Sequence, residues 1–266
     1  MSEVLSRVCG LGGKPALLTI AFPGLEPEAE RPRLEVSNGV MTLEGTARLV
    51  GCAAIADYVV LFAREEGGDE SCLVIETAAH GVLAGETEDM LGLTAVPFAD
   101  VEFSRVEISD RLLVGLRGGA APEREQALAA FRGFTAAIAM GAARAAHAKA
   151  EQYARERYQF GKMLIEHQEM RRMLGNMAVK TNTGTAAYIQ GFEGEPLASL
   201  ATAARPELAK VFCTDAALEV AMDAIQVHGG LGYMKEAGLE KTMRDMKMLQ
   251  VLERSNRFVE VEHPEA

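Results

Sequence analysis

The spacing of hydrophobic residues changes once along this 266-residue chain, near Pro122. Before that point, short apolar runs alternate with polar residues, which is typical of half-buried β-strands. After it, apolar residues recur every three or four positions over long stretches, which is typical of helices with one buried face. The two periods suit different secondary structures, so the pattern predicts an α+β chain. We expect a small antiparallel β domain over residues 1–118, followed by an up-down four-helix-bundle-like domain over residues 119–266.

The β half carries one clear turn signal. Leu34 and Val36 alternate with polar residues, and Asn38 and Gly39 follow as a two-residue hairpin signal. A slip in the alternation between residues 101 and 108 predicts a β-bulge. Further strands are expected over residues 17–22, 58–63 and 72–75.

The helical half opens at Pro122, where Glu123 and Glu125 suit the first turn of a helix. This first helix should run through an alanine-rich stretch to about Arg157. A second helix is expected around residues 170–177, and Pro206 should open a third. We expect the large apolar residues to form the buried faces: Leu128, Phe131, Phe134 and Ile138 in the first helix, Met170, Met173, Leu174 and Met177 in the second, and Leu208, Val211, Phe212, Leu218, Met222 and Ile225 in the third.

Composition excludes several classes of protein. The formal net charge is −11, whereas a nucleic-acid-binding domain needs a basic face. No apolar run is long enough to span a bilayer, and the five histidines do not cluster as metal ligands. Four widely spaced cysteines fit neither a zinc site nor a disulfide framework. We therefore expect a cytoplasmic protein without a bound metal.

Four segments carry residues that core packing does not readily explain. Arg157 could grip a pyrophosphate, or it could simply complement the dipole at the end of a helix. Phe160 could stack on an adenine ring or lie in a core, and a glycine cluster could admit a ligand close to the backbone or end a helix. The four segments cover residues 157–168, 223–233, 244–245 and 252–255.

In their order and spacing, these segments resemble the C-terminal domain of the acyl-CoA dehydrogenase family. The family pattern is R-x-x-F-G, then Q-x-x-G-G-x-G, then M-R-D, and finally E-G-T. The resemblance implies that the cofactor is flavin adenine dinucleotide (FAD) and that these residues reach the FAD of a neighbouring subunit, so the protein should be an oligomer. The cofactor-binding residues implied in this way are Arg157, Phe160, Gln226, Gly229, Gly230, Gly232 and Ser255.

The resemblance also implies a general base, Glu253, at the position of the family's catalytic glutamate. In the family this base removes the α-proton of an acyl-CoA thioester, and a carboxylate in an apolar pocket would suit that task. By itself, Glu253 could equally be a surface glutamate. Phe131 occupies the alternative position at which some family members carry the base. Arg132 and Arg254 are expected to contact the substrate, and Arg254 replaces the family's glycine beside the base.

Two departures concern the contacts to a subunit's own flavin ring. Residues 21–26 do not keep the family's acidic-P-x-x-G-S-D loop, and residues 49–53 read L-V-G-C-A in place of W-I-T-N-G. The family's N-terminal helical domain has no counterpart in this sequence. Residues that serve a neighbour's FAD are thus retained, while those that serve the chain's own flavin ring are lost.

This pattern predicts one subunit of a heteromeric enzyme, an α2β2 heterotetramer with a longer acyl-CoA dehydrogenase homologue. The resemblance further implies fatty acid or sterol catabolism, with electron-transferring flavoprotein as the electron acceptor. Two alternatives remain open: a non-catalytic subunit that completes the partner's FAD site, and a flavin monooxygenase on the same fold.

Overall fold

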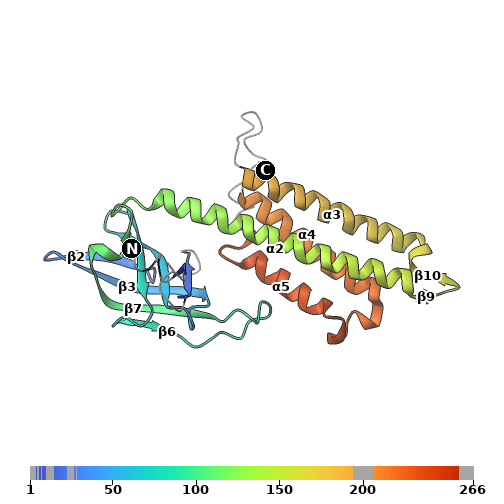
Figure 1. Cartoon of the computed structure of the whole chain (residues 1–266), viewed down its shortest axis with the longest axis horizontal. Helices are drawn as coiled ribbons and strands as arrows, with labels where there is room; N and C mark the ends of the chain where they lie inside the picture. The colour runs from blue at the N-terminus through green and yellow to red at the C-terminus, as the bar shows by residue number, and fades with distance from the viewer. Residues whose placement is uncertain are drawn as a thin grey trace. The chain divides into compact units, whose positions relative to one another are not determined.

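The structure is a computed structural model that describes residues 4, 6, 8, 9, 15–22, 27, 29–193 and 206–257. It divides into two compact units (Figure 1). The first comprises Met1–Met90 and Thr94–Leu128, and the second comprises Leu91–Leu93 and Ala129–Ala266. Among the described helices, none has the length and apolar character needed to cross a membrane.

The first unit is built on one sheet, whose strands follow the order β6-β7-β3-β2-β4-β5-β8, with β1 beside β4. Most neighbours are antiparallel, but β1 and β2 each pair parallel with β4. Leucine, valine and alanine side chains from one face form the core of this unit. The strands are β1 (Leu18–Ala21), β2 (Arg33–Ser37), β3 (Val40–Gly51), β4 (Tyr58–Glu65), β5 (Glu70–Glu76), β6 (Val82–Ala84), β7 (Phe98–Ile108) and β8 (Leu113–Val114).

Both local signals in the β half are confirmed. Asn38 and Gly39 have φ values of 52° and 79° and join β2 to β3 with Ser37 opposite Val40. Two successive residues with positive φ are what a tight hairpin turn requires. In β7 the register with β3 shifts between the pairs formed by Leu43 and Gly45, and this is the predicted bulge.

The second unit is a bundle of helices, as the sequence predicts (Figure 1). The first helix begins and ends near the expected residues and the third begins at Pro206, whereas the second is much longer than the stretch around residues 170–177 that marked it. The long helices are α2 (Ala121–Glu156), α3 (Gln168–Glu193), α4 (Pro206–His228) and α5 (Leu239–Val251). Short pieces connect them or flank the sheet: β9 (Tyr158–Gln159), β10 (Lys162–Met163), and the 3-10 turns η1 (Asp110–Leu112), η2 (Leu164–Glu166), η3 (Gly229–Leu231) and η4 (Lys235–Ala237).

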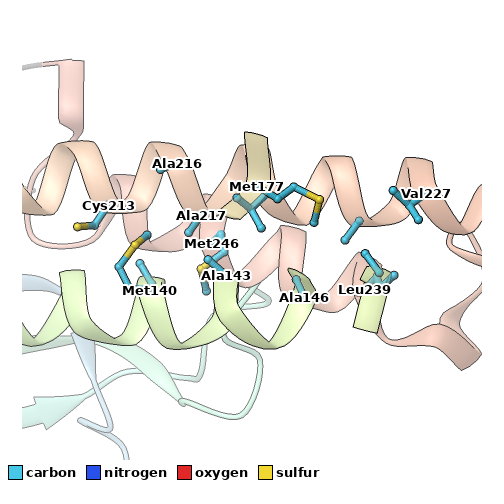
Figure 2. Packing of buried hydrophobic residues seen from close by; sticks show 14 of the residues in the cluster. Met140, Ala143, Ala146, Met177, Cys213, Ala216, Ala217, Val227, Leu239 and Met246 are labelled. Carbon is cyan, nitrogen blue, oxygen red and sulfur yellow. The ribbon is translucent and has the colours of Figure 1, made fainter. Parts of the chain in front are cut away.

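The expected buried faces of two helices are only partly correct, since Leu128 of α2 is buried but other large residues are not. Phe134 and Ile138 of α2 and Phe212 and Met222 of α4 each leave 43–62% of their surface exposed. The residues that α2 and α4 bury instead are mostly small (Figure 2). Small side chains let helix backbones approach closely, and the larger apolar residues then fall on the outer surface. The buried residues of α2 in this cluster are Ala136, Ala139, Met140, Ala143, Ala146, Ala150 and Ala154.

Close packing between α2 and α3 predicts opposite effects for two glycines of α3. A Cβ at Gly184 would lie 2.2 Å from the sulfur of the buried Met140, whereas a Cβ at Gly175 meets nothing within 4 Å. We expect Gly175→Ala to raise the free energy of unfolding by up to about 1 kcal/mol through helix propensity. Gly184→Ala should lower it by about 1–3 kcal/mol through overpacking.

Chemical denaturation of the full chain, followed by helical circular dichroism, measures both changes under the same conditions. Equal stability of the two variants would contradict the close α2–α3 contact.

Candidate functional site

The C-terminal ends of α2 and α4 meet at one end of the helical unit. The rings of Tyr153 and His228 stack there, with centroids 4.4 Å apart and planes 18° from parallel. The ring nitrogen Nδ1 of His228 lies 2.8 Å from the carbonyl oxygen of Ala224. This stack brings the segment after α2 and the glycine cluster after α4, which are far apart in sequence, to the same end of the unit.

Arg157 follows α2 directly and its side chain is exposed. Its backbone is fixed on both sides: its N–H donates to Tyr153 at 2.9 Å, and its carbonyl accepts from Leu164 at 2.8 Å. Phe160, at the tip of the β9–β10 hairpin, has φ 54° and is 89% exposed, so its ring is not a core contact in this chain. An arginine just before the hairpin and an aromatic ring at its tip, three positions apart in sequence, are therefore both exposed.

The glycine cluster contains two different kinds of position. Gln226, Gly229 and Gly230 are exposed, and added Cβ atoms at the two glycines would meet nothing within 4 Å. A ligand can therefore approach the backbone at Gly229 and Gly230. Gly232 is buried, and a Cβ there would lie 2.4 Å from the carbonyl oxygen of Ile225. Glycine at position 232 is thus required by the chain's own packing.

Arg244 and Asp245 hold a short loop of the chain. Arg244 donates from Nη1 to the carbonyl of Leu91 at 2.7 Å, and Asp245 accepts from the backbone N–H of Leu93 at 2.7 Å. Gly92 fits between them so closely that a Cβ would lie 2.1 Å from the carbonyl oxygen of Arg244. This motif therefore has a structural task that the sequence did not reveal.

Glu253 lies just after α5 and is buried, with 8% of its surface exposed. Both of its carboxylate oxygens accept hydrogen bonds from Arg132 of α2: Oε2 from Nε at 3.0 Å and Oε1 from Nη2 at 2.9 Å. Glu207 lies 3.9 Å from the same guanidinium. The setting of Glu253 is therefore charged, whereas the sequence predicted an apolar pocket.

Two arginines lie next to Glu253: Arg132 contacts its carboxylate, and Arg254 follows it in the sequence. Arg132, expected at the substrate, forms the bidentate ion pair with Glu253 in this structure. Arg254 has no left-handed backbone conformation, so an arginine in place of the family's glycine causes no backbone strain. Glu253 itself has φ 65°. Ser255 follows and is partly buried.

Sequence reasoning missed Lys210, which is 2% exposed on the inner face of α4. The pKa of its ammonium is lowered to about 8: burial is the largest cause and the nearby Arg132 acts in the same direction, while Glu253 and Asp215 act in the opposite direction. A lysine between the apolar residues of a helix was the available signal, but the predicted buried face of α4 did not include position 210.

The residues around Glu253 and those around Arg157 lie far apart along α2, since Arg132 is in the first half of this helix and Arg157 directly follows its last residue. Arg132 precedes the last residue of this helix, Glu156, by about 24 residues, which at 1.5 Å per residue corresponds to roughly 36 Å. Arg157 and the exposed glycines are therefore far from Glu253 within one chain. If both groups serve the same kind of ligand, they serve two separate copies of it.

Residues 49–53, where the family carries W-I-T-N-G, belong to the core of the β unit. Val50 and Ala53 are buried, and Leu49 has φ 49° with its N–H bonded to Asp100 at 2.8 Å. These side chains pack inward and offer no aromatic ring to a ligand. Most of the other departing loop, residues 23–26, lies outside the described residues.

Comparisons with known proteins show which family this chain resembles. The family model for "Acyl-CoA dehydrogenase, C-terminal domain" matches residues 123–256. The chain is 28% identical to cyclohex-1-ene-1-carbonyl-CoA dehydrogenase of Syntrophus aciditrophicus over 92% of its length and 62% of the relative's. It is 30% identical to an acyl-CoA dehydrogenase of Bacillus subtilis, over 90% of this chain and 64% of that one.

Among solved structures, butyryl-CoA dehydrogenase of Megasphaera elsdenii matches with a TM-score of 0.81 and 25% identity, over 91% of this chain and 66% of that one. The chain thus spans about three fifths of the length of the curated relatives it matches. The family model covers half of the chain, including Arg157, the glycine cluster and Glu253. The chain belongs to the acyl-CoA dehydrogenase family.

Proposed function

We propose that this chain is a subunit of an FAD-dependent acyl-CoA dehydrogenase that forms the α,β double bond of an acyl-CoA thioester. The observation that carries the proposal is Glu253, a buried carboxylate in a left-handed turn whose two oxygens are both bonded by one arginine. A position with this strain and this cost of burial is typical of a functional residue. The electron acceptor implied by the family is electron-transferring flavoprotein.

Glu253 acts as the general base in this proposal. Each carboxylate oxygen accepts one hydrogen bond from Arg132 and keeps a second lone-pair position with which to take the α-proton. Arg132 therefore orients the base without blocking it. Burial of the pair excludes water from the reacting atoms. Arg254, next in sequence, is close enough to the base to contact the substrate.

The exposed end of the helical unit fits the pyrophosphate and adenosine parts of FAD. Arg157 offers a guanidinium for a phosphate, Phe160 an exposed aromatic ring, and Gln226 an amide for a purine or ribose edge. The backbone at Gly229 and Gly230 is open to close approach. FAD, when bound, supplies the acceptor for the hydride that leaves the β-carbon. Ser255, two residues after the proposed base Glu253, is the proposed cofactor contact far from Arg157.

The separation of the two groups supports a second subunit. About 36 Å along α2 is more than one FAD should bridge within a single chain, so Arg157 and Gln226 are proposed to hold the FAD of a neighbour. The large apolar side chains of Phe134, Ile138 and Phe212, exposed on the single chain, suit burial in such an assembly. The loss of aromatic residues over 49–53 favours a longer homologue as that neighbour.

A second candidate function is a non-catalytic subunit that completes the partner's FAD site. Arg132 satisfies both oxygens of Glu253 within the chain, which is also what a purely structural ion pair would show. The two functions differ in one step, the abstraction of the α-proton.

Replacement of the base decides between these functions. We expect Glu253→Gln to retain FAD and substrate but to slow flavin reduction by about 10²–10⁴-fold, the usual contribution of a general base. Anaerobic bleaching of the flavin by acyl-CoA in the assembled enzyme measures the rate. Glu207→Gln, which alters the other carboxylate near Arg132, is the control and should bleach normally. Bleaching of Glu253→Gln at the wild-type rate would establish the non-catalytic function.

The phosphate contact has its own test. Arg157→Ala should weaken FAD binding by on the order of 1.5–3 kcal/mol, the value of a charge-assisted hydrogen bond, and leave the helical circular dichroism unchanged. Isothermal titration of the apo-complex with FAD gives the affinity. Arg155→Ala, which removes an arginine in the last turn of α2 that pairs with Glu151, is the matched control. Equal affinities for the two variants would remove Arg157 from the site.

Assembly gives the third test of the proposal. Produced alone, the chain should bind FAD weakly, because its own unit lacks the aromatic contacts to the flavin ring. Co-expression with a longer homologue should yield an α2β2 complex with one FAD for each pair, as measured by analytical ultracentrifugation and flavin absorbance. A purified monomer that carries one FAD per chain would refute the heteromeric arrangement.

A further inference from the structure

Lys210 binds the segment that carries Glu253. Its Nζ donates to the carbonyl oxygens of Gln250 at 3.2 Å and Arg254 at 2.7 Å, and to Oδ1 of Asn256 at 2.8 Å. An ammonium has three hydrogens, and these three acceptors use all of them. The acceptors lie on both sides of Glu253 in the sequence, so a single side chain of α4 fixes the two ends of the turn.

Asn256 completes the attachment from the other side. Its Nδ2 donates to Oδ1 of Asp215 at 2.7 Å and to Oγ1 of Thr214 at 2.9 Å, both on α4. Asp215 also accepts from the side chain of Gln250 at 2.6 Å. Residues 250–256 are therefore tied to one stretch of α4 by three side chains.

The turn needs such support because its conformation is unfavourable by itself. The helix α5 ends at Val251, and Glu253 adopts φ 65°, a region that non-glycine residues seldom occupy. Within the turn, the N–H of Arg254 bonds to Leu252 at 2.8 Å. Contacts from outside the turn must therefore keep Glu253 in this conformation.

The cost of burying Lys210 also indicates that its hydrogen bonds to the turn are important. An ammonium that is 2% exposed has lost nearly all of its hydration, and such groups persist only where every hydrogen is bonded. An apolar residue of similar length would fill the space without that penalty. What it could not do is bind two carbonyls and an amide oxygen at once.

We propose that Lys210 and Asn256 are positioning residues that hold Glu253 in its left-handed turn and thereby direct its carboxylate. The catalytic consequence rests on the proposed function of Glu253, whereas the structural part does not. Lys210 does not contact the reacting atoms. Its effect passes through the backbone of residues 250–256 to the side chain of Glu253.

Hydrogen exchange tests the structural part without reference to catalysis. In the assembled protein, Lys210→Met should speed exchange at the amides of residues 252–256 by on the order of tenfold or more, since it removes hydrogen bonds from a charged donor. Exchange in α3 should stay as in wild type. The matched control is Lys180→Met, which removes a lysine of α3 that pairs with Glu219. Unchanged exchange over residues 252–256 in Lys210→Met overturns the proposal.

A double-mutant cycle tests the catalytic part. Lys210→Met should slow anaerobic flavin reduction by about 100-fold, as expected for a misplaced catalytic group, with little change in substrate affinity. In the Glu253→Gln background, the same substitution should have no further effect, because Lys210 acts only through Glu253. Equal effects in both backgrounds would show that Lys210 does not act through the base and would overturn this part.

The two proposals can fail separately. If Glu253→Gln alone bleaches like wild type, Glu253 is not the base, and the exchange result still decides whether Lys210 holds the turn. If Lys210→Met does not assemble, Asn256→Ala removes the attachment to Thr214 and Asp215 from the other side. It should give the same local increase in exchange and the same dependence on Glu253, and normal exchange in that variant would count against the proposal.

Discussion

The helical unit depends on how closely α2 approaches its neighbours. Six alanines and Met140 form the buried side of this 36-residue helix within the main cluster, with little else to fill the space between backbones. Such a contact leaves no room for extra atoms, as the position of Gly184 against Met140 shows.

Close packing by small residues determines where the large ones lie. Phe134 and Ile138 of α2, and Phe212 and Met222 of α4, cannot enter an interface built for alanine, so they remain on the surface of the single chain. A surface of this kind is unfavourable in water unless another protein covers it. The same helix carries Arg132 in its first half and leads into Arg157 after its last residue.

Local signals in the sequence predicted the elements well. Asn38 and Gly39 fixed the hairpin, and Pro122, Pro206 and the glycines after His228 fixed the helix ends, since each acts through its own backbone conformation. The buried face of α3 was predictable from periodicity, since Leu174 and Met177 are buried, but those of α2 and α4 were not fully so. Whether Phe134 or Ala136 faces inward depends on the size of the residues on the opposite helix. The spacing of hydrophobic residues along one helix does not contain that information, and it assigns the larger apolar side chain to the core.

The candidate site shows the same division. The spacing of Glu253 from Gln226 could be read along the chain, and so could the glycine cluster. The partner of Glu253 is Arg132, 121 positions earlier, and only folding brings the two together. Gly232 was assigned to the cofactor from its motif, whereas its contact with Ile225 shows that packing alone requires a glycine there.

Buried charge distinguishes the end of α5 from the rest of the helical unit. Arg132, Glu253 and Lys210 would each be costly to bury alone. Arg132 and Glu253 compensate each other, and Lys210 is compensated by its three acceptors in residues 250–256. An apolar set of residues would stabilise the bundle at least as well, so packing does not account for them. The charged residues instead fix the position of the carboxylate of Glu253. Arg132 of α2 orients its oxygens, while Lys210 of α4 binds the backbone of the turn that carries it. Two independent supports for one carboxylate are expected where its position, more than its contribution to stability, matters.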